Sequence, residues 1–332
     1  MTDTSTGSAA QLLGRLRLPV VAAPMFLVSG PDLVVAASRA GILGAFPTPN
    51  CRTLDELDTW MGTITDQLGE ATPAEPDARA PWAVNLVTHR SNSRLADDLA
   101  LVAQYQPDVV ITALGSPLPV MEVVKSYGGL VIADVVNLAL ARKAVAAGVD
   151  GLACVSAGAG GHTGHLSPFA FCSAVRDFFD GIVTIGGGIS DGAGVAGAIA
   201  AGADLVYMGT RFLATSESMA QQEFKQMVVD HGPDDLIISA GITGTPASWL
   251  RPSLVANGLD LDALATPAPR SYDSGGTEDV AKRWKDLWAA GQGLQTITSI
   301  QPVAQVVDEL ERGYLEAATR LAARAIASAQ VK

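Results

Sequence analysis

A histidine inside a run of glycines is the strongest candidate for chemistry in this sequence. Residues 156–164 read Ser-Ala-Gly-Ala-Gly-Gly-His-Thr-Gly and directly follow the apolar segment Gly151–Val155. Glycines leave little side-chain packing around an imidazole, so we expect His162 to lie at a cleft. A neutral imidazole near pH 7 can accept a proton from carbon, which makes His162 the candidate general base. His165 is the alternative base, and a structural role for either ring stays open.

Two further glycine clusters follow consecutive apolar segments near the middle of the chain. Gly186–Gly188 come directly after Ile182–Ile185, and Gly209-Thr210 come directly after Leu205–Met208. Without Cβ atoms, the backbone N–H groups of such turns can approach a phosphate, and the dipole of a following helix favours its charge. The pair of clusters predicts a phosphate-binding site, with simple tight turns as the alternative.

Metal and thiol chemistry have weaker support in the sequence. His162 and His165 could ligate a metal, but no carboxylate or cysteine lies at a suitable spacing, so we predict no metal site. The three cysteines, Cys51, Cys154 and Cys172, lack a C-x-x-C spacing. An odd cysteine count suits a reducing compartment, and buried cysteines behave as small hydrophobic residues.

The elements that must position these residues alternate in type along the chain. Eight short runs rich in Val, Ile and Leu are continuous rather than alternating, as expected of parallel strands covered on both faces. Ala-rich stretches with helical spacing lie between most of them. The eight expected strands are Pro19–Ala23, Ile42–Phe46, Trp82–Leu86, Val109–Thr112, Leu130–Ala133, Gly151–Val155, Ile182–Ile185 and Leu205–Met208.

A small repeat supports this alternation of helices and strands. Ala40-Gly41, Ala147-Gly148 and Ala201-Gly202 each end an Ala-rich segment, and an apolar run follows at once. A glycine just past a helix end takes the left-handed conformation, which a Cβ would resist. Eight strands with intervening helices predict an α/β fold of the (β/α)8 TIM-barrel type, in preference to a doubly wound open sheet.

We expect four parts along the chain. Residues 1–17 are small and polar at their start and are expected to form a flexible N-terminal tail. Residues 18–214 form the barrel, and residues 215–300 form a smaller, mainly helical cap over one end. The amphipathic stretch within residues 301–332 is expected to be a final helix that packs on the barrel.

Composition excludes several classes of function. Hydrophobic residues make up 48% of the 332 residues and charged residues 17%, which is typical of a compact globular protein. The net charge of −12 disfavours binding to nucleic acid or to an anionic membrane. No signal peptide and no apolar run long enough to span a bilayer is evident, so we expect a cytoplasmic protein that acts on a small molecule. A homo-oligomer is compatible with the sequence.

In order along the chain, these motifs resemble the nitronate monooxygenases, formerly called 2-nitropropane dioxygenases. The resemblance runs from about Leu18 to Phe212, with a weaker match beyond. The Gly-Gly-His-x-Gly run is its most specific part, because the two phosphate turns also resemble those of inosine-monophosphate dehydrogenases. The matching pieces are Ala23-Pro24-Met25, Val84-Asn85-Leu86, Ala159-Gly160-Gly161-His162, Gly187-Gly188-Ile189 and Met208-Gly209-Thr210-Arg211-Phe212.

The resemblance implies a barrel flavoprotein that uses FMN. By position, Gly187, Gly188, Gly209 and Thr210 would hold the FMN phosphate, and His162 would be the catalytic base. Further residues implied to line the flavin are Ala23, Pro24, Met25, Asn85, Asp134, Ala159, Gly160, Gly161, Met208 and Gln292.

Three departures from the family pattern flank the implied flavin. Asp134 stands where many members have a lysine at the end of the fifth strand, and Gly158 stands where an acidic residue is common. Ala22-Ala23 replaces a Gln-Gly pair. A lysine at position 134 could stabilise negative charge on reduced flavin, whereas an aspartate could not.

The implied reaction is the oxidation of nitroalkanes or alkyl nitronates by O2 to carbonyl compounds and nitrite. One alternative keeps the flavin but uses NADH or NADPH to reduce an enoyl thioester or a quinone. A second alternative is a barrel enzyme without flavin that binds a phosphorylated metabolite; inosine-monophosphate dehydrogenases carry a nucleophilic cysteine in a loop that has none here. A non-catalytic scaffold is disfavoured because such glycine-rich loops cost backbone entropy.

Overall fold

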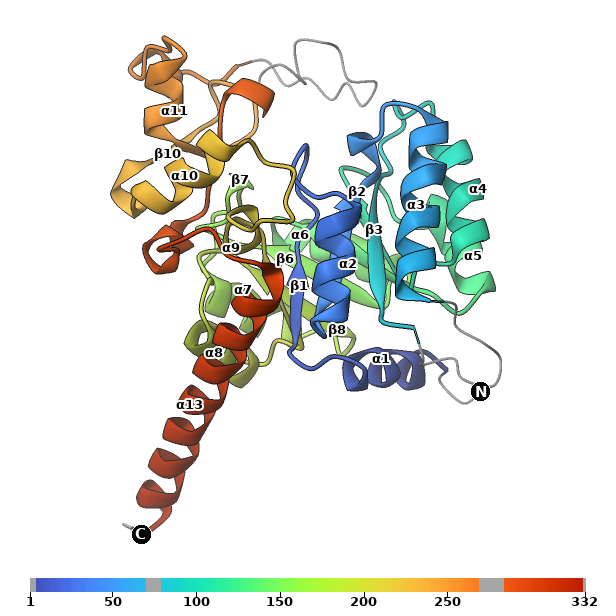
Figure 1. Ribbon diagram of the computed structural model, residues 1–332. Helices are drawn as coiled ribbons and strands as arrows, with labels where there is room; N and C mark the ends of the chain where they lie inside the picture. The colour runs from blue at the N-terminus through green and yellow to red at the C-terminus, as the bar shows by residue number, and fades with distance from the viewer. Residues whose placement is uncertain (1–3, 70–78, 269–283, 331–332) are drawn as a thin grey trace.

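Eight parallel strands close into a barrel. The structure is a computed structural model that describes residues 4–69, 79–268 and 284–330. Around the barrel the strands follow the order β1-β2-β3-β4-β5-β6-β8-β9 (Figure 1). Each lies within two residues of an expected strand, so the barrel prediction is confirmed. The strands are β1 (Val20–Ala22), β2 (Leu43–Pro47), β3 (Trp82–Val87), β4 (Val109–Ala113), β5 (Leu130–Val135), β6 (Gly151–Val155), β8 (Ile182–Gly186) and β9 (Leu205–Met208).

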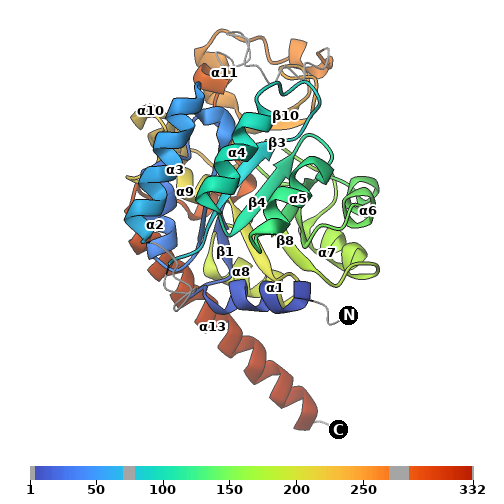
Figure 2. The same cartoon turned by 90° about the vertical axis from the view of Figure 1, so that its right-hand side faces the viewer.

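Seven helices surround the barrel between successive strands (Figure 2). They are α2 (Pro31–Arg39), α3 (Leu54–Leu68), α4 (Leu95–Tyr105), α5 (Leu118–Ser126), α6 (Leu138–Ala146), α7 (Pro168–Arg176) and α8 (Gly192–Ala200). Helix α3 begins at a capping box between Thr53 and Glu56. Gly41, Gly148 and Gly202 have φ values of 87°, 85° and 103°, as the Ala-Gly repeat predicts.

The N-terminal residues differ from the expected flexible tail. Thr4–Gly14 form helix α1, which lies below the barrel in Figure 1. Leu12 is buried in one cluster with inward-facing strand residues such as Val109 and Leu205, and Leu13 and Leu16 pack against that cluster. The helix therefore covers apolar side chains at the amino-terminal end of the barrel, and this burial orders a segment whose composition alone predicts a tail.

Three aspartates form a repeated stabilising arrangement at this lower end of the barrel. Each directly precedes a strand, accepts a backbone N–H from the neighbouring strand and contacts an arginine or lysine. Asp108 accepts from Trp82 N at 3.2 Å, Asp150 from Val131 N at 2.7 Å and Asp204 from Val183 N at 2.7 Å. Their cationic partners are Arg15 and Arg79, Lys125, and Arg176. These contacts tie adjacent strands together at the end remote from the predicted site.

Replacing Asp150 with alanine should lower the free energy of unfolding by about 2–3 kcal/mol. The buried N–H of Val131 would lose its acceptor, and hydrogen bonds to charged groups contribute roughly this much. Urea denaturation followed by circular dichroism measures the loss. The exposed Asp180 provides the control, because its replacement with alanine should change stability by less than about 0.5 kcal/mol. Equal effects of the two changes would contradict a role for the lower aspartates.

The cap combines helices with a small sheet. Residues after the last barrel strand form α9 (Thr210–Leu213), α10 (Gln222–Asp230), β10 (Leu236–Ser239), β11 (Ala247–Leu250), α11 (Arg251–Ala256) and the 3-10 turns η2 (Pro233–Asp235), η3 (Ala263–Ala265) and η4 (Gln292–Thr296). The sheet has the order β10-β11-β7, and β7 (Gly161–His162) comes from the loop after β6. Residues 269–283 of the expected cap lie outside the described residues, and residues 284–286 are helical.

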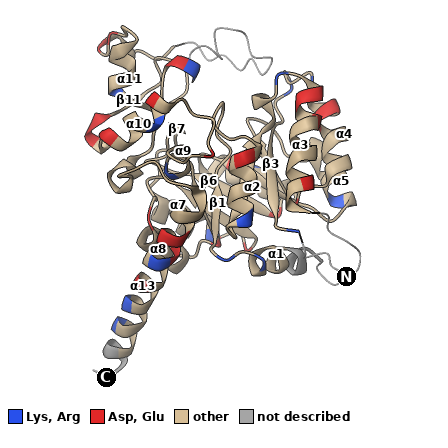
Figure 3. Cartoon of the chain, in the orientation of Figure 1, with Lys and Arg blue, Asp and Glu red and all other residues tan. Residues whose placement is uncertain are grey.

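The final helix, α13 (Val303–Gln330), packs on the barrel only with its first half. Val303, Val306, Val307 and Leu310 are buried and belong to the main core cluster. Figure 1 shows the second half extending away from the body, where Leu321 and Ile326 are exposed. Figure 3 shows acidic residues on the outer helices α3, α4 and α10, and both signs of charge along α13. Among the described helices, none is both long and apolar enough to cross a membrane.

Candidate active site

The residues singled out in the sequence gather at the carboxyl ends of the strands, the end at which TIM-barrel active sites form. Their places in the fold are as follows: Ala23, Pro24 and Met25 directly after β1, Asn85 in β3, Asp134 in β5, Ala159 and Gly160 in the loop after β6, Gly161 and His162 in β7, Gly187 and Gly188 after β8, Met208 at the end of β9, Gly209 and Thr210 at the start of α9, and Gln292 at the start of η4.

The two predicted phosphate turns have backbone N–H donors without acceptors. Within the described residues, the backbone N–H groups of Gly187, Gly188 and Gly209 donate to no other protein group. Gly187 and Gly188 have φ values of 141° and 68°, a region that side chains rarely adopt. A Cβ on Gly187 would lie 2.6 Å from Ala157 O, so a larger residue does not fit there. Open N–H groups in such a turn are suited to an anion.

A cap segment connects these turns to the loop after β6. Gly291 N donates to Thr210 Oγ1 at 2.9 Å, and Gln292 N donates to Gly158 O at 2.9 Å. A Cβ on Gly160 would lie 2.6 Å from Gly291 N, so these two backbones are in close approach. The Gln292 side chain lies within 4 Å of the Cβ positions that Gly158 and Gly188 would have. Gln292 is thus placed between two of the predicted flavin-binding loops.

The loop after β1 lies beside the second phosphate turn. A Cβ on Gly209 would lie 3.4 Å from Met25 Sδ. Asn50 holds this loop: its side chain accepts from Leu27 N at 2.7 Å and donates to Met25 O at 3.1 Å. Leu27 has a φ of 61°, a conformation that costs a non-glycine residue about 1–2 kcal/mol. Such strain is concentrated at functional sites, and here it shapes the loop next to Gly209.

His162 lies at the edge of the cap sheet, where it pairs with Ala247 of β11. Its ring packs edge-on against Trp284 with 5.4 Å between centroids, and Trp284 in turn contacts Trp249. The side chain is exposed, yet the surrounding walls desolvate the ring and lower the pKa of His162 below its ordinary value of 6.5. An accessible imidazole that stays neutral near pH 7 can act as a base.

A polar group of side chains lies on the inside of the barrel. Asn85 Nδ2 donates to Asp134 Oδ2 at 3.5 Å, a long contact. Burial raises the pKa of Asp134 to about 7, and the nearby hydroxyl of Tyr207 partly opposes this rise. Near neutral pH this carboxyl is therefore partly protonated.

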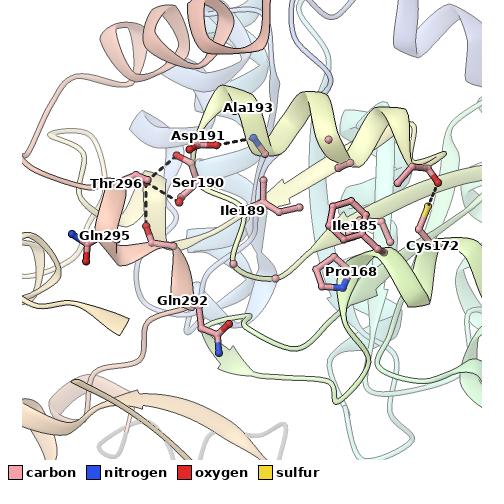
Figure 4. Close-up of a pocket in the computed structure, with 18 residues that line it drawn as sticks. Pro168, Cys172, Ile185, Ile189, Ser190, Asp191, Ala193, Gln292, Gln295 and Thr296 are labelled. Carbon is pink, nitrogen blue, oxygen red and sulfur yellow. Dashed lines mark hydrogen bonds between the residues drawn. The ribbon is translucent and has the colours of Figure 1, made fainter. Parts of the chain in front are cut away.

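A cavity of about 370 Å³ borders the first phosphate turn from the outer side. It lies between α7 and α8 and contains Gly187, Gly188 and Gln292 among its lining residues. In Figure 4, Ser190 and Thr296 lie at one end, joined by a 2.8 Å hydrogen bond, and Cys172 and Ile185 lie at the other. His162, Asn85, Asp134 and Gly209 do not line it.

Among the described residues, no group of three or more His, Cys, Asp or Glu side chains is placed to hold a metal ion. Cys51, Cys154 and Cys172 are buried thiols, and desolvation raises the pKa of each. They are therefore poor nucleophiles.

Sequence reasoning missed several residues that shape the site. Trp284 and Trp249 support His162 from the cap, and nothing local in the sequence indicates this contact. Asn50 follows β2 as an ordinary polar loop residue. The inward direction of Tyr207 could have been predicted from the sequence. Tyr207 lies two residues after Leu205 on β9, and residues two apart on a strand face the same side.

Comparison with known proteins identifies the family of this chain. The sequence profile of the nitronate monooxygenase family matches residues 10–313. The chain is 29% identical over 354 residues to a nitronate monooxygenase from Paraburkholderia phytofirmans, covering 94% of this chain and 96% of that protein.

Two further similar proteins are named for other reactions. A (3aS,4S,5R,7aS)-5-hydroxy-7a-methyl-1-oxo-octahydro-1H-indene-4-carboxyl-CoA dehydrogenase from Rhodococcus jostii is 31% identical, over 76% of this chain and 68% of that protein. A nitroalkane oxidase structure from Streptomyces ansochromogenes is 25% identical with a TM-score of 0.78, covering 94% of this chain and 99% of that chain. The chain belongs to the nitronate monooxygenase family and is an enzyme of the oxidoreductase type.

Proposed function

We propose that this protein is an FMN-dependent oxidoreductase that oxidises alkyl nitronates or nitroalkanes with O2 to carbonyl compounds and nitrite. The observation that carries the proposal is the set of three open backbone N–H groups on two adjacent turns, in a chain of the nitronate monooxygenase family. An accessible imidazole at the same end of the barrel adds the base that a neutral nitroalkane requires.

The residues fit a flavin mononucleotide. The N–H groups of Gly187, Gly188 and Gly209 suit its phosphate, and the cap segment at Gly291 and Gln292 encloses these turns. Met25 and Asn85 offer an apolar and a polar contact for the ring system. When bound, FMN would supply the electron transfer.

The role of the protein in this reaction is to bind, orient and move a proton. His162 takes the proton from the carbon next to the nitro group, and the lowered pKa keeps its ring in the accepting form. The aromatic contact with Trp284 fixes the ring plane. A substrate supplied as the nitronate has already lost that proton and depends less on His162.

The test is anaerobic mixing of the purified holoprotein with ethyl nitronate, nitroethane, NADH or NADPH. We expect a yellow protein with the FMN spectrum, whose flavin bleaches with ethyl nitronate or nitroethane and which forms nitrite once O2 is admitted. A Gly209→Val variant should lose flavin, because the side chain would enter the space beside Met25. A colourless protein that takes up no added FMN would exclude the proposal.

A second candidate function is suggested by the carboxyl-CoA dehydrogenases among the relatives at 31% identity. In this candidate, the same flavin site would exchange electrons with a CoA thioester, with NAD(P)H as the reductant. Bleaching by NADH or NADPH but not by ethyl nitronate or nitroethane would favour this candidate over the first.

A further inference from the structure

Two buried side chains inside the barrel mouth each have a polar atom without a hydrogen bond of ordinary geometry, although the two groups lie close enough to interact with each other. Asp134 Oδ1 and Tyr207 Oη are both inaccessible to solvent, and neither makes a hydrogen bond of ordinary geometry with the described residues. Their residues face the barrel interior from the carboxyl ends of β5 and β9, since side-chain direction alternates along a strand and Leu130, Ile132 and Leu205 face inward. Buried polar atoms without partners are uncommon and point to a missing ligand.

The surroundings of Asp134 explain why the pKa of its carboxyl is raised. Of the titratable groups, Tyr207 lies close enough to affect the carboxyl, and the thiol of Cys154 on the adjacent β6 senses its charge. No Lys, Arg or His of the described residues compensates a negative charge at Asp134. Asn85 reaches Asp134 Oδ2 from β3, which leaves Oδ1 for another group. The carboxyl can therefore take up a proton, whereas burial raises the pKa of the Tyr207 phenol, which keeps its own.

The cluster also lies next to the predicted phosphate turn. Tyr207 is two residues before Gly209, so the phenol and the open N–H of Gly209 belong to the same strand end. A ligand whose phosphate is held at Gly209 can therefore bring a polar ring into the mouth above Asp134. The donors and acceptors of such a ring would satisfy the two atoms that lack partners.

We propose that Asp134 and Tyr207 bind the polar edge of the flavin ring and that Asp134 takes up a proton from solvent when the flavin is reduced. This inference rests on the proposed function. The electrons come from the reductant, and no bond to carbon is made or broken at Asp134. Added electron density near an uncompensated carboxylate raises its affinity for a proton, so reduction and protonation are coupled.

The experiment is to measure the reduction potential of the bound flavin from about pH 5 to pH 9, anaerobically, with dithionite and reference dyes. The proteins are the wild type, Asp134→Asn, Tyr207→Phe and, as a matched control, the exposed Asp180→Asn. Above about pH 7, where Asp134 is mostly ionised before reduction, the wild type should take up as much as about one more proton per two electrons than Asp134→Asn. Asp180→Asn should match the wild type.

Tyr207→Phe gives a second, independent measurement. The Tyr207 hydroxyl lowers the pKa of Asp134, so its removal should move the proton-coupled range to higher pH. An Asp134→Asn profile that matches the wild type would overturn the inference. If Asp134→Asn binds no flavin, an unshifted Tyr207→Phe profile overturns it and an upward shift supports it. A wild type that binds no FMN overturns the proposed function instead.

Discussion

Turnover of a neutral nitroalkane should fall roughly 100- to 10,000-fold when His162 is replaced by asparagine, the usual contribution of a positioned acid or base. The flavin content should stay unchanged, because asparagine is a small polar replacement and His162 is not among the residues proposed to contact the phosphate. Turnover of a preformed alkyl nitronate should fall much less. Steady-state nitrite release with both substrate forms, normalised to bound FMN, provides the measurement.

The dependence of activity on pH tests the same role of His162. The base must be unprotonated, and desolvation lowers the pKa of His162 from its ordinary value of 6.5. Activity with a nitroalkane should therefore persist below pH 6.5 and decline only in more acidic solution. His165→Asn is the control, because its side chain is also exposed and lies three residues away. A larger loss in His165→Asn than in His162→Asn would transfer the role of base to His165.

Replacement of Gly192 by valine should destabilise the protein by about 3 kcal/mol or more. A Cβ at this position would lie 2.1 Å from Leu310 O and 2.3 Å from Tyr314 N, both backbone atoms of α13. Backbone cannot rotate away as a flexible side chain can, so α8 and α13 would have to separate. That separation would expose the buried Val303 and Val307. Guanidinium denaturation measures the change in the free energy of unfolding.

The matched control for this prediction lies in the same helix. Gly197 is also within α8, and a Cβ there would meet only Phe169 at 3.9 Å. Gly197→Ala should therefore stabilise the protein slightly, by up to about 1 kcal/mol, through helix propensity alone. If both changes destabilise the protein to the same extent, the loss arises from α8 itself rather than from its contact with α13.

The barrel was predictable because its signals are local. Each strand is a short continuous apolar run, and Gly41, Gly148 and Gly202 mark three helix ends through the conformation they adopt. Asp191 likewise caps α8 by accepting from Gly194 N. These features depend on neighbours within a few residues, so they can be predicted from the local sequence.

The parts of the fold that were not predicted from the sequence depend on contacts between distant segments. The short strand β7 exists only because β11, more than 80 residues later, pairs with it. Helix α1 is ordered by inward-facing residues from several strands. The predicted roles of His162 and of the flavin-lining residues stay predictions, and their support is the placement of these residues at one end of the barrel.

The pairing of β7 with β11 limits how this enzyme can be recombined with its relatives. The strand that bears His162 is encoded within the barrel half of the chain, but its partner is encoded in the cap. A chimaera that exchanges residues 215–300 alone would leave the imidazole against a foreign strand edge and without Trp284. Exchange of residues 158–164 together with the cap should preserve the pairing of β7 with β11. These two separated stretches therefore form one structural unit.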